Sequence, residues 1–185
     1  VPVNITIPFG YVNTHMSGSA VQASVAVKII FCSLNDLFSG DLVSVLIKEI
    51  GVSYVIIRCG YRGSTTGALI EDPKFRSNIQ GAQKAGLKVG VYFFTQAVNE
   101  VEAVEEASMV ISLVKGYNIS YPVFLDVEAS NGRGDRIDAS TRTAVCRAFC
   151  QTIQNSGYKA GIYANKTWLN SYLDAPGLSS YKIWL

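Results

Sequence analysis

From residue 51 onward, strand-like and helix-like segments alternate along the chain, and this alternation limits the fold more than any other feature of the sequence. The strand-like runs are mostly apolar and β-branched, as expected for strands that are covered on both faces. The runs between them carry apolar residues at three- and four-residue spacing, which predicts helices. Strands are predicted at 53–61, 87–97, 122–127, 158–165 and 181–185, and helices at 73–86, 99–116 and 139–157.

Repeated strand–helix–strand units imply parallel strands that are joined by crossover helices. The units recur at roughly 30–35 residues, which suits a β/α barrel or a doubly wound sheet. In both architectures the functional groups gather at the carboxyl ends of the strands. We therefore predict an α/β fold in which 54–60, 88–94, 122–127 and 159–163 are neighbouring parallel strands.

The first 50 residues have a different character. Residues 1–27 contain no Lys, Arg, Asp or Glu, and residues 40–51 are predicted to form a helix that leads into the first clear strand. We therefore treat 1–30 as an atypical N-terminal segment and 31–185 as the main domain.

Composition and charge exclude several classes of protein. Hydrophobic residues make up 49% of the 185 residues and charged residues 16%, which is typical of a globular chain. The net charge of +2 suits weak attraction to an anionic surface such as a cell wall, and it is too small to predict nucleic-acid binding. No apolar run approaches the ~18–20 residues of a membrane span. The N-terminus lacks a basic region followed by an apolar one, so no signal peptide is predicted.

The cysteines predict neither a metal site nor a disulfide framework. Cys32, Cys59, Cys146 and Cys150 form no C-x-x-C pair, and His15 is the only histidine. Cys146 and Cys150 would share one helical face, where a disulfide would be strained. We expect free, mostly buried thiols. The thin inventory of metal ligands predicts no metal and no other cofactor.

Two carboxylates follow the apolar run Pro122-Val123-Phe124-Leu125 in the segment PVFLDVEAS. Buried strands exclude charge unless the charge is paired or used. Residues two apart on a strand point the same way, so Asp126 and Glu128 are predicted to sit side by side at one strand end. Mutual repulsion would raise the pKa of one of them. The pair could serve acid/base chemistry, or it could cap the next segment or pair with an arginine.

Five segments of the chain, taken together, resemble a known enzyme family. They are GVSYVIIRCGYRG, EDPKFRSNIQGAQKAGLKVGVYFFTQA, PVFLDVE, GYKAGIYAN and YKIWL. In order, residue identity and spacing these segments are similar to the motifs of glycoside hydrolase family 25, the N-acetylmuramidase lysozymes. The resemblance covers about residues 51–185.

The resemblance implies an irregular parallel β/α barrel, similar to a TIM barrel, that is incomplete at both ends in this chain. It implies cleavage of the β-1,4 bond between N-acetylmuramic acid and N-acetylglucosamine in peptidoglycan. Glu128 matches the general acid of the family and Asp126 its companion carboxylate. Two carboxyl groups in different protonation states are what glycoside cleavage requires. The implied partner is the peptidoglycan glycan strand, for a monomer that acts outside the cell or at the cell wall.

Aromatic residues at or near the strand ends are the second part of the implied site. Sugar rings stack on aromatic faces, and tyrosine hydroxyls bind sugar oxygens. On the resemblance we assign Tyr61, Tyr92, Tyr163 and Trp184 to substrate binding, with packing of the barrel interior as the alternative. Asp72 resembles an acidic position of the family near the cleft, and it could equally begin the helix that follows Pro73.

The chain departs from the family pattern at both ends. Family members begin with GIDVSxxQGxIDWxxVK, whose first strand supplies another catalytic aspartate. An ungapped alignment puts Leu34 at that aspartate and Ser44 at the tryptophan, and Asp36 is the nearest acidic substitute. The chain ends at Leu185, before the family's last strand. We therefore expect a muramidase of reduced activity, with a non-catalytic wall-binding module and a remnant domain without a ligand as alternatives.

Overall fold

The computed structural model describes residues 29–31 and 53–185 of the chain. Its strands are β1 (Ile29–Phe31), β2 (Tyr54–Arg62), β3 (Leu69–Glu71), β4 (Lys88–Phe94), β5 (Val123–Asp126), β6 (Ala160–Tyr163) and β7 (Lys182–Trp184). Its helices are α2 (Phe75–Lys84), α3 (Glu100–Val114), α4 (Ala139–Asn155) and α5 (Lys166–Ser171), with short 3-10 turns η1 (Arg133–Arg136) and η2 (Pro176–Leu178). The helix predicted at 40–51 lies outside the described residues.

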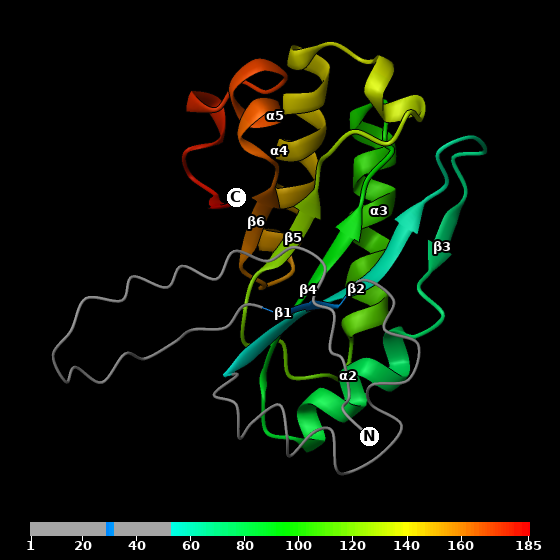
Figure 1. Cartoon of the computed structure of the whole chain (residues 1–185), viewed down its shortest axis with the longest axis vertical. Coiled ribbons are helices and arrows are strands. Elements are labelled where there is room, and N and C mark those ends of the chain that lie inside the picture. The colour runs from blue at the N-terminus through cyan, green and yellow to red at the C-terminus, as the bar shows by residue number, and fades with distance from the viewer. Residues whose placement is uncertain (1–28, 32–52) are drawn as a thin grey trace, which may run out of the picture.

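The strands form a mostly parallel sheet. Its order is β1-β2-β4-β5-β6-β7, and β3 pairs antiparallel with the end of β2. Every other described pairing is parallel. The prediction that β2, β4, β5 and β6 are neighbouring parallel strands is therefore confirmed. Figure 1 shows the arrowheads of β2, β4 and β5 pointing toward the same end of the molecule.

The described pairings form an open path from β1 to β7. Among residues 29–31 and 53–185, no ladder joins β7 back to β1. The α/β class and the parallel order are thus established, and closure into a TIM-like barrel stays a prediction. The predicted boundary between residues 30 and 31 falls inside β1, whose neighbours on both sides lie outside the described part of the chain.

The sheet has two different faces. One is covered by α2, α3 and α4 (Figure 1), which bury apolar side chains such as Ala82, Ala107 and Phe149 against alternate strand residues such as Ile57 and Leu125. The opposite face, here called the inner face, carries a second cluster that is mostly aromatic. This cluster consists of Tyr54, Ile56, Tyr92, Phe124 and Trp184, with Tyr121 and Tyr163 packed against it.

Side-chain caps fix where three of the helices begin. Asn99 accepts a hydrogen bond from the Glu102 amide at the start of α3 (2.9 Å), and Asp138 accepts one from the Thr141 amide at the start of α4 (2.7 Å). Asn165 caps α5 in the same way. Each cap satisfies a backbone N–H that the helix itself leaves unpaired. No helix among the described residues is long and apolar enough to cross a membrane.

The prediction of free, buried thiols is confirmed for three of the four cysteines. Cys59, Cys146 and Cys150 are buried and unbonded to one another, and Cys32 lies outside the described residues. Burial raises the pKa of Cys146 to about 12, so this thiol is not an activated nucleophile.

A bulge in β2 decides which side chains reach the inner face. The register with β4 shifts by one residue between Arg58 and Gly60, which leaves Cys59 as an extra residue. Bulges re-aim the side chains that follow them. Arg58 and Tyr61, three positions apart, therefore point the same way, and the Arg58 guanidinium carbon lies 5.5 Å from the centroid of the Tyr61 ring.

Glycine is required at the bulge. A Cβ atom on Gly60 would lie 2.7 Å from the carbonyl oxygen of Ile70 and 3.0 Å from the Phe93 ring. We expect Gly60→Ala to lower the free energy of unfolding by about 1–3 kcal/mol, because the β2–β3 pair must separate to make room. Urea unfolding measures the change. Ser108→Ala, on the exposed face of α3, is the control and should shift stability by less than about 0.5 kcal/mol; an equal effect in both variants would contradict the assignment.

Candidate active site

One row of paired residues crosses the inner face at the carboxyl ends of the strands. Tyr61 on β2 pairs with Phe94 on β4, and Phe94 pairs with Asp126 on β5. Asp126 pairs with Tyr163 on β6, which pairs with Trp184 on β7. The structure thus brings four of the predicted site residues into a single row, although they are spread over more than 120 positions of the sequence. The rings of Tyr163 and Trp184 contact each other, with centroids 4.8 Å apart.

Asp126 is a nearly buried carboxyl group. The residue is 7% exposed, and its Oδ1 has no hydrogen-bond partner among residues 29–31 and 53–185. Burial raises the pKa of Asp126 well above its usual value, and the nearby charge of Glu128 raises it further. The positive charge of Arg58 acts in the opposite direction. A carboxyl oxygen that is both buried and unpartnered is costly to stability, which is common where a group serves a ligand.

Glu128 lies two residues after Asp126, beyond the end of β5. The chain between them still follows the sheet, because the Val127 amide donates to the Tyr163 carbonyl at 2.9 Å and Val127 packs into the helix-side core. Alternation then turns Glu128 toward the inner face, as Asp126 is. Glu128 is half-buried, and this burial raises its pKa. Both carboxyl groups therefore retain protons to higher pH than exposed ones.

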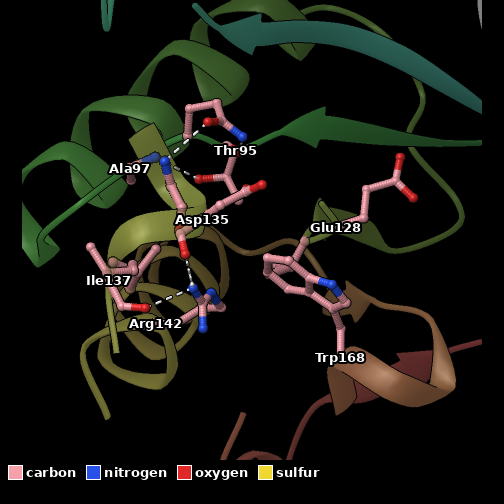
Figure 2. Close-up of a pocket in the computed structure, with 11 residues that line it drawn as sticks. Thr95, Ala97, Glu128, Asp135, Ile137, Arg142 and Trp168 are labelled. Carbon is pink, nitrogen blue, oxygen red and sulfur yellow. Dashed lines mark hydrogen bonds between the residues drawn. The ribbon is translucent and has the colours of Figure 1, made fainter. Parts of the chain in front are cut away.

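The loop after Glu128 closes a small, tightly built pocket. Figure 2 shows the carboxyl group of Glu128 directed away from Arg142 and Asp135. The Arg142 guanidinium donates a hydrogen bond to the Asp135 carbonyl. The pocket holds about 10 Å³, roughly the space of one water molecule. It is therefore part of the packing beneath the loop and too small for a sugar ring. It is lined by Thr95, Gln96, Ala97, Val127, Glu128, Gly134, Asp135, Ile137, Arg142, Val145 and Trp168.

A larger cavity of about 470 Å³ opens on the inner face. It lies on the amino-terminal side of the row, and Trp184 is the only residue of the row that lines it. The rings of Tyr54 and Tyr121 stack at its wall with centroids 4.4 Å apart. Its other lining residues are Ile56, Ser120, Pro122, Phe124, Lys159, Lys182 and Ile183.

A buried carboxylate on α3 holds the ends of β2 and β4 against this helix. Glu106 is fully buried and accepts hydrogen bonds from Arg62 Nε (2.9 Å), Thr95 Oγ1 (2.7 Å) and the Gln96 amide (3.4 Å). Burial raises the pKa of Glu106 to about 7, against the lowering effect of Thr95 and Arg62. Three converging donors fit the ionised carboxylate, so we assign Glu106 as the anion that pairs with Arg62.

Gln96 connects Glu106 to the loop that follows Glu128 through hydrogen bonds. Its side-chain amide donates to Ser130 Oγ (2.8 Å) and accepts from the Gly134 amide (3.0 Å). Arg133 of the same loop forms a two-pronged ion pair with Glu102 on α3 (2.8 and 2.9 Å). The loop is thus bonded both to the segment after β4 and to α3.

The remaining predicted residues are more enclosed. Asp72 is 3% exposed and accepts hydrogen bonds from Arg58 Nε (2.5 Å) and from the Lys74 amide (2.8 Å). The structure therefore places Asp72 at the start of α2, the alternative that the sequence left open. Tyr92 is 2% exposed and packs within the inner-face cluster. A direct contact of either residue with substrate stays a prediction.

Sequence patterns alone did not single out Arg58 or Glu106. Arg58 interrupts the apolar run YVIIRCGY, which is the same signal that pointed to Asp126. Glu106 stands among four glutamates of α3, and only its place on the buried face of the helix distinguishes it from the other three.

The chain belongs to the glycosyl hydrolases of family 25: the family model matches residues 38–185. The curated autolytic lysozyme of Clostridium acetobutylicum is 28% identical over 129 residues, which cover 69% of this chain and 35% of that protein. The chain thus spans about a third of the length of that relative.

Solved structures show the same fold. The modular autolysin LytC of Streptococcus pneumoniae matches with a TM-score of 0.70 and 29% identity, over 84% of this chain and 36% of that one. LytC has also been solved with a synthetic peptidoglycan ligand. A family 25 glycosyl hydrolase of Bacillus anthracis matches with a TM-score of 0.64 and 20% identity, over 92% of this chain and 74% of that one, which supports the fold.

Removing the Glu106 carboxylate should destabilise the protein strongly. Glu106→Ala removes the buried carboxylate partner of Arg62 and leaves this buried guanidinium only the exposed Glu105 carboxylate (3.0 Å), for which we expect a loss of about 3–5 kcal/mol of unfolding free energy. Chemical denaturation measures it. Glu100→Ala, exposed in the first turn of the same helix, is the control and should cost less than about 1 kcal/mol. Similar losses in both variants would show that the ion pair is not what holds α3 to the sheet.

Removing the Asp126 charge should have the opposite effect on stability. Because the folded-state pKa is raised, the stabilising contribution of Asp126 is complete below its unfolded pKa and is lost as pH rises through the folded pKa. Asp126→Asn should therefore raise the melting temperature at pH 7–8 and have little effect near pH 3. Each unit of pKa difference corresponds to about 1.4 kcal/mol. Thermal melts at both pH values test this, and a lower melting temperature at pH 7–8 would contradict it.

Proposed function

We propose that this chain is the catalytic part of a peptidoglycan hydrolase. It cleaves the β-1,4 bond between N-acetylmuramic acid and N-acetylglucosamine by acid/base catalysis on two carboxyl groups. The observation that carries the proposal is the row at the carboxyl edge of the sheet, where Asp126 is buried beside Glu128 and flanked by aromatic rings. Membership of family 25 supports the same chemistry.

Glu128 is proposed as the general acid. Its burial favours the protonated form, so a proton is available for the leaving glycosidic oxygen. Asp126 is the companion carboxylate, which stabilises positive charge at the anomeric carbon or orients the N-acetyl group of the substrate. Since each carboxylate disfavours a second one nearby, the pair shares its protons in a way that suits one acid and one base.

Tyr61, Tyr163 and Trp184 are proposed to contact the glycan. They flank Asp126 along the row, and their rings offer apolar faces to sugar C–H groups. Tyr92 lies one step deeper on the same face, where its ring supports the others. Water-excluding aromatic walls also strengthen the electrostatic effect of the two carboxyl groups.

The proposed site of action is the cell wall outside the cell. Relatives are described as an autolytic lysozyme and a modular autolysin, and one is solved with a peptidoglycan ligand. The proposed partner of this chain is accordingly the glycan strand, recognised by a monomer without nucleic acid. The catalytic domain is proposed to span residues 31–185.

The first strand is proposed to limit the rate. β1 consists of Ile29, Ile30 and Phe31 and carries no acidic residue, whereas the family resemblance implies a catalytic aspartate on this strand. Leu34 and Asp36 lie outside the described residues. Loss of a group that stabilises developing charge costs about 10²–10³ in rate, so we propose weak muramidase activity. A non-catalytic wall-binding module is the second candidate, and the same feature of β1 favours it.

Glu128→Gln tests the catalytic assignment. The amide keeps the shape of the side chain and cannot donate the proton, so wall lysis should fall about 10²–10⁴-fold. Lysis is followed as the loss of turbidity of purified cell walls. Glu100→Gln, an exposed glutamate on α3, is the matched control and should lyse walls as the parent does.

A sedimentation assay with insoluble peptidoglycan separates the two candidate functions. The parent chain and Glu128→Gln should both bind peptidoglycan, because the aromatic row is intact in each. Binding without lysis in the parent would favour the wall-binding module. Substantial lysis by Glu128→Gln would show that the acid has been misassigned.

A further inference from the structure

Arg58 is held firmly at the edge of the candidate site. Its Nε donates to Asp72 Oδ2 at 2.5 Å, and the Arg58 side chain is 26% exposed while that of Asp72 is 4% exposed. Asp72 is fixed in turn, because its Oδ1 accepts from the Lys74 amide (2.8 Å) and its own amide donates to the Cys59 carbonyl (3.0 Å). A carboxylate with both oxygens engaged and its backbone tied to β2 is a rigid anchor for a guanidinium.

The bulge and the Tyr61 ring define where the guanidinium lies. Arg58 continues the alternation of Tyr54 and Ile56, both of which line the inner-face cavity, so Arg58 points to the inner face as well. The extra residue in β2 adds Tyr61 to that face, and the Arg58 guanidinium stacks at 5.5 Å from its ring. Cation–π contact and the ion pair together restrict a side chain that is otherwise long and flexible.

Arg58 and Asp126 share this face across two strand spacings. Arg58 pairs with Tyr92, Tyr92 pairs with Phe124, and Asp126 follows Phe124 by two residues on the same side of β5. The backbones of β2 and β5 are therefore about 10 Å apart across the sheet. The long Arg58 side chain shortens this distance where it extends toward the carboxyl ends of the strands. The positive charge of Arg58 is felt at Asp126, where it lowers the pKa against the effects of burial and Glu128.

We propose that Arg58 is a positioning residue for the Asp126 carboxylate, and that Asp72 acts by holding the Arg58 guanidinium in place and not by touching the glycan. The proposal rests on the proposed function. Its consequence is a division of roles, in which the charge of Arg58 favours the anion at Asp126 and leaves the shared proton to Glu128. Glycoside cleavage needs this asymmetry between two carboxyl groups.

Two other cations of the inner face, Lys159 and Lys182, line the cavity on the amino-terminal side of the row that holds Asp126. The titratable side chains that face Asp126 from the described elements are Arg58 and Tyr61 on β2, Tyr92 on β4, Glu128 after β5 and Tyr163 on β6. Two groups thus act on the titration of Asp126 besides its burial: Arg58, whose charge favours the Asp126 anion, and Glu128, whose carboxylate form disfavours it.

A purely structural role for the ion pair makes a different prediction. If Asp72 only began α2 and Arg58 only neutralised it, substitutions would lower stability and leave the titration of Asp126 unchanged. If Asp72 contacted the glycan, its substitution would raise KM and leave the pH profile unchanged. The titration of Asp126 and the KM for the glycan therefore separate three roles of the ion pair: positioning of Asp126, structural support alone, and contact of Asp72 with the glycan.

The test follows the Asp126 carboxyl carbon by NMR on the full chain labelled with ¹³C-aspartate, with Asp126→Asn used to assign its signal. In Arg58→Gln we expect the titration midpoint of Asp126 to move to higher pH. In Asp72→Asn, which keeps an oxygen for the Lys74 amide, the midpoint should move the same way by less. Arg58→Lys keeps the charge and should restore most of the parent behaviour.

Activity adds a second readout. Arg58→Gln should lower kcat at least about tenfold with little change in KM, and should shift the pH profile. The titration is measured whether or not the chain lyses walls, so failure of the muramidase assignment and failure of this proposal are distinguishable. A folded Arg58→Gln that keeps the parent midpoint at Asp126 would overturn the proposal. If that variant does not fold, Asp72→Asn with the parent midpoint would overturn it.

Discussion

The in-register pairing of parallel strands is the constraint on which the rest of the site depends. Asp126 meets Phe94 on one side and Tyr163 on the other because the ladders of β5 with β4 and β6 run without a break. A slip of one residue in either ladder would turn the carboxyl group toward the helices. The apolar residues that alternate with the site, such as Val123 and Leu125, specify this register because they fill the helix-side core.

Ionisable side chains are buried on both faces of the sheet, and the two sets differ in whether their polar atoms are paired. Behind the sheet, Glu106 and Arg62 are fully paired, and they tie the end of β4 to α3. On the inner face, Asp126 is buried with an oxygen that no group in the described part of the chain satisfies. The first arrangement supports the loops at the carboxyl edge, and the second places an unsatisfied carboxyl group at the same edge. Stability from the satisfied network offsets the cost of the unsatisfied carboxyl group.

Periodicity in the sequence was enough to predict the parallel strands β2, β4, β5 and β6, because their apolar runs are long and bounded by helices. It also placed Asp126 at a strand end. It did not predict β3 or the bulge at Cys59, since three residues show no period and one added residue leaves an apolar run apolar. Nor could it tell that Asp72 is enclosed by Arg58 and the start of α2, because the partner lies 14 residues away and is brought close only by the β2–β3 turn.

The extra residue in β2 has a consequence for how this gene can vary. Deleting one codon at the bulge would keep the reading frame and leave β2 nearly as long and as apolar as before. It would nevertheless reverse the side chains that follow it in β2, so that Tyr61 would face the helices and Arg62 would face the side of the sheet that carries Asp126. Glu106 would then lose its partner inside the core. A short deletion at this point is therefore far more damaging than one in the exposed turn at residues 64–66, although both remove a single amino acid.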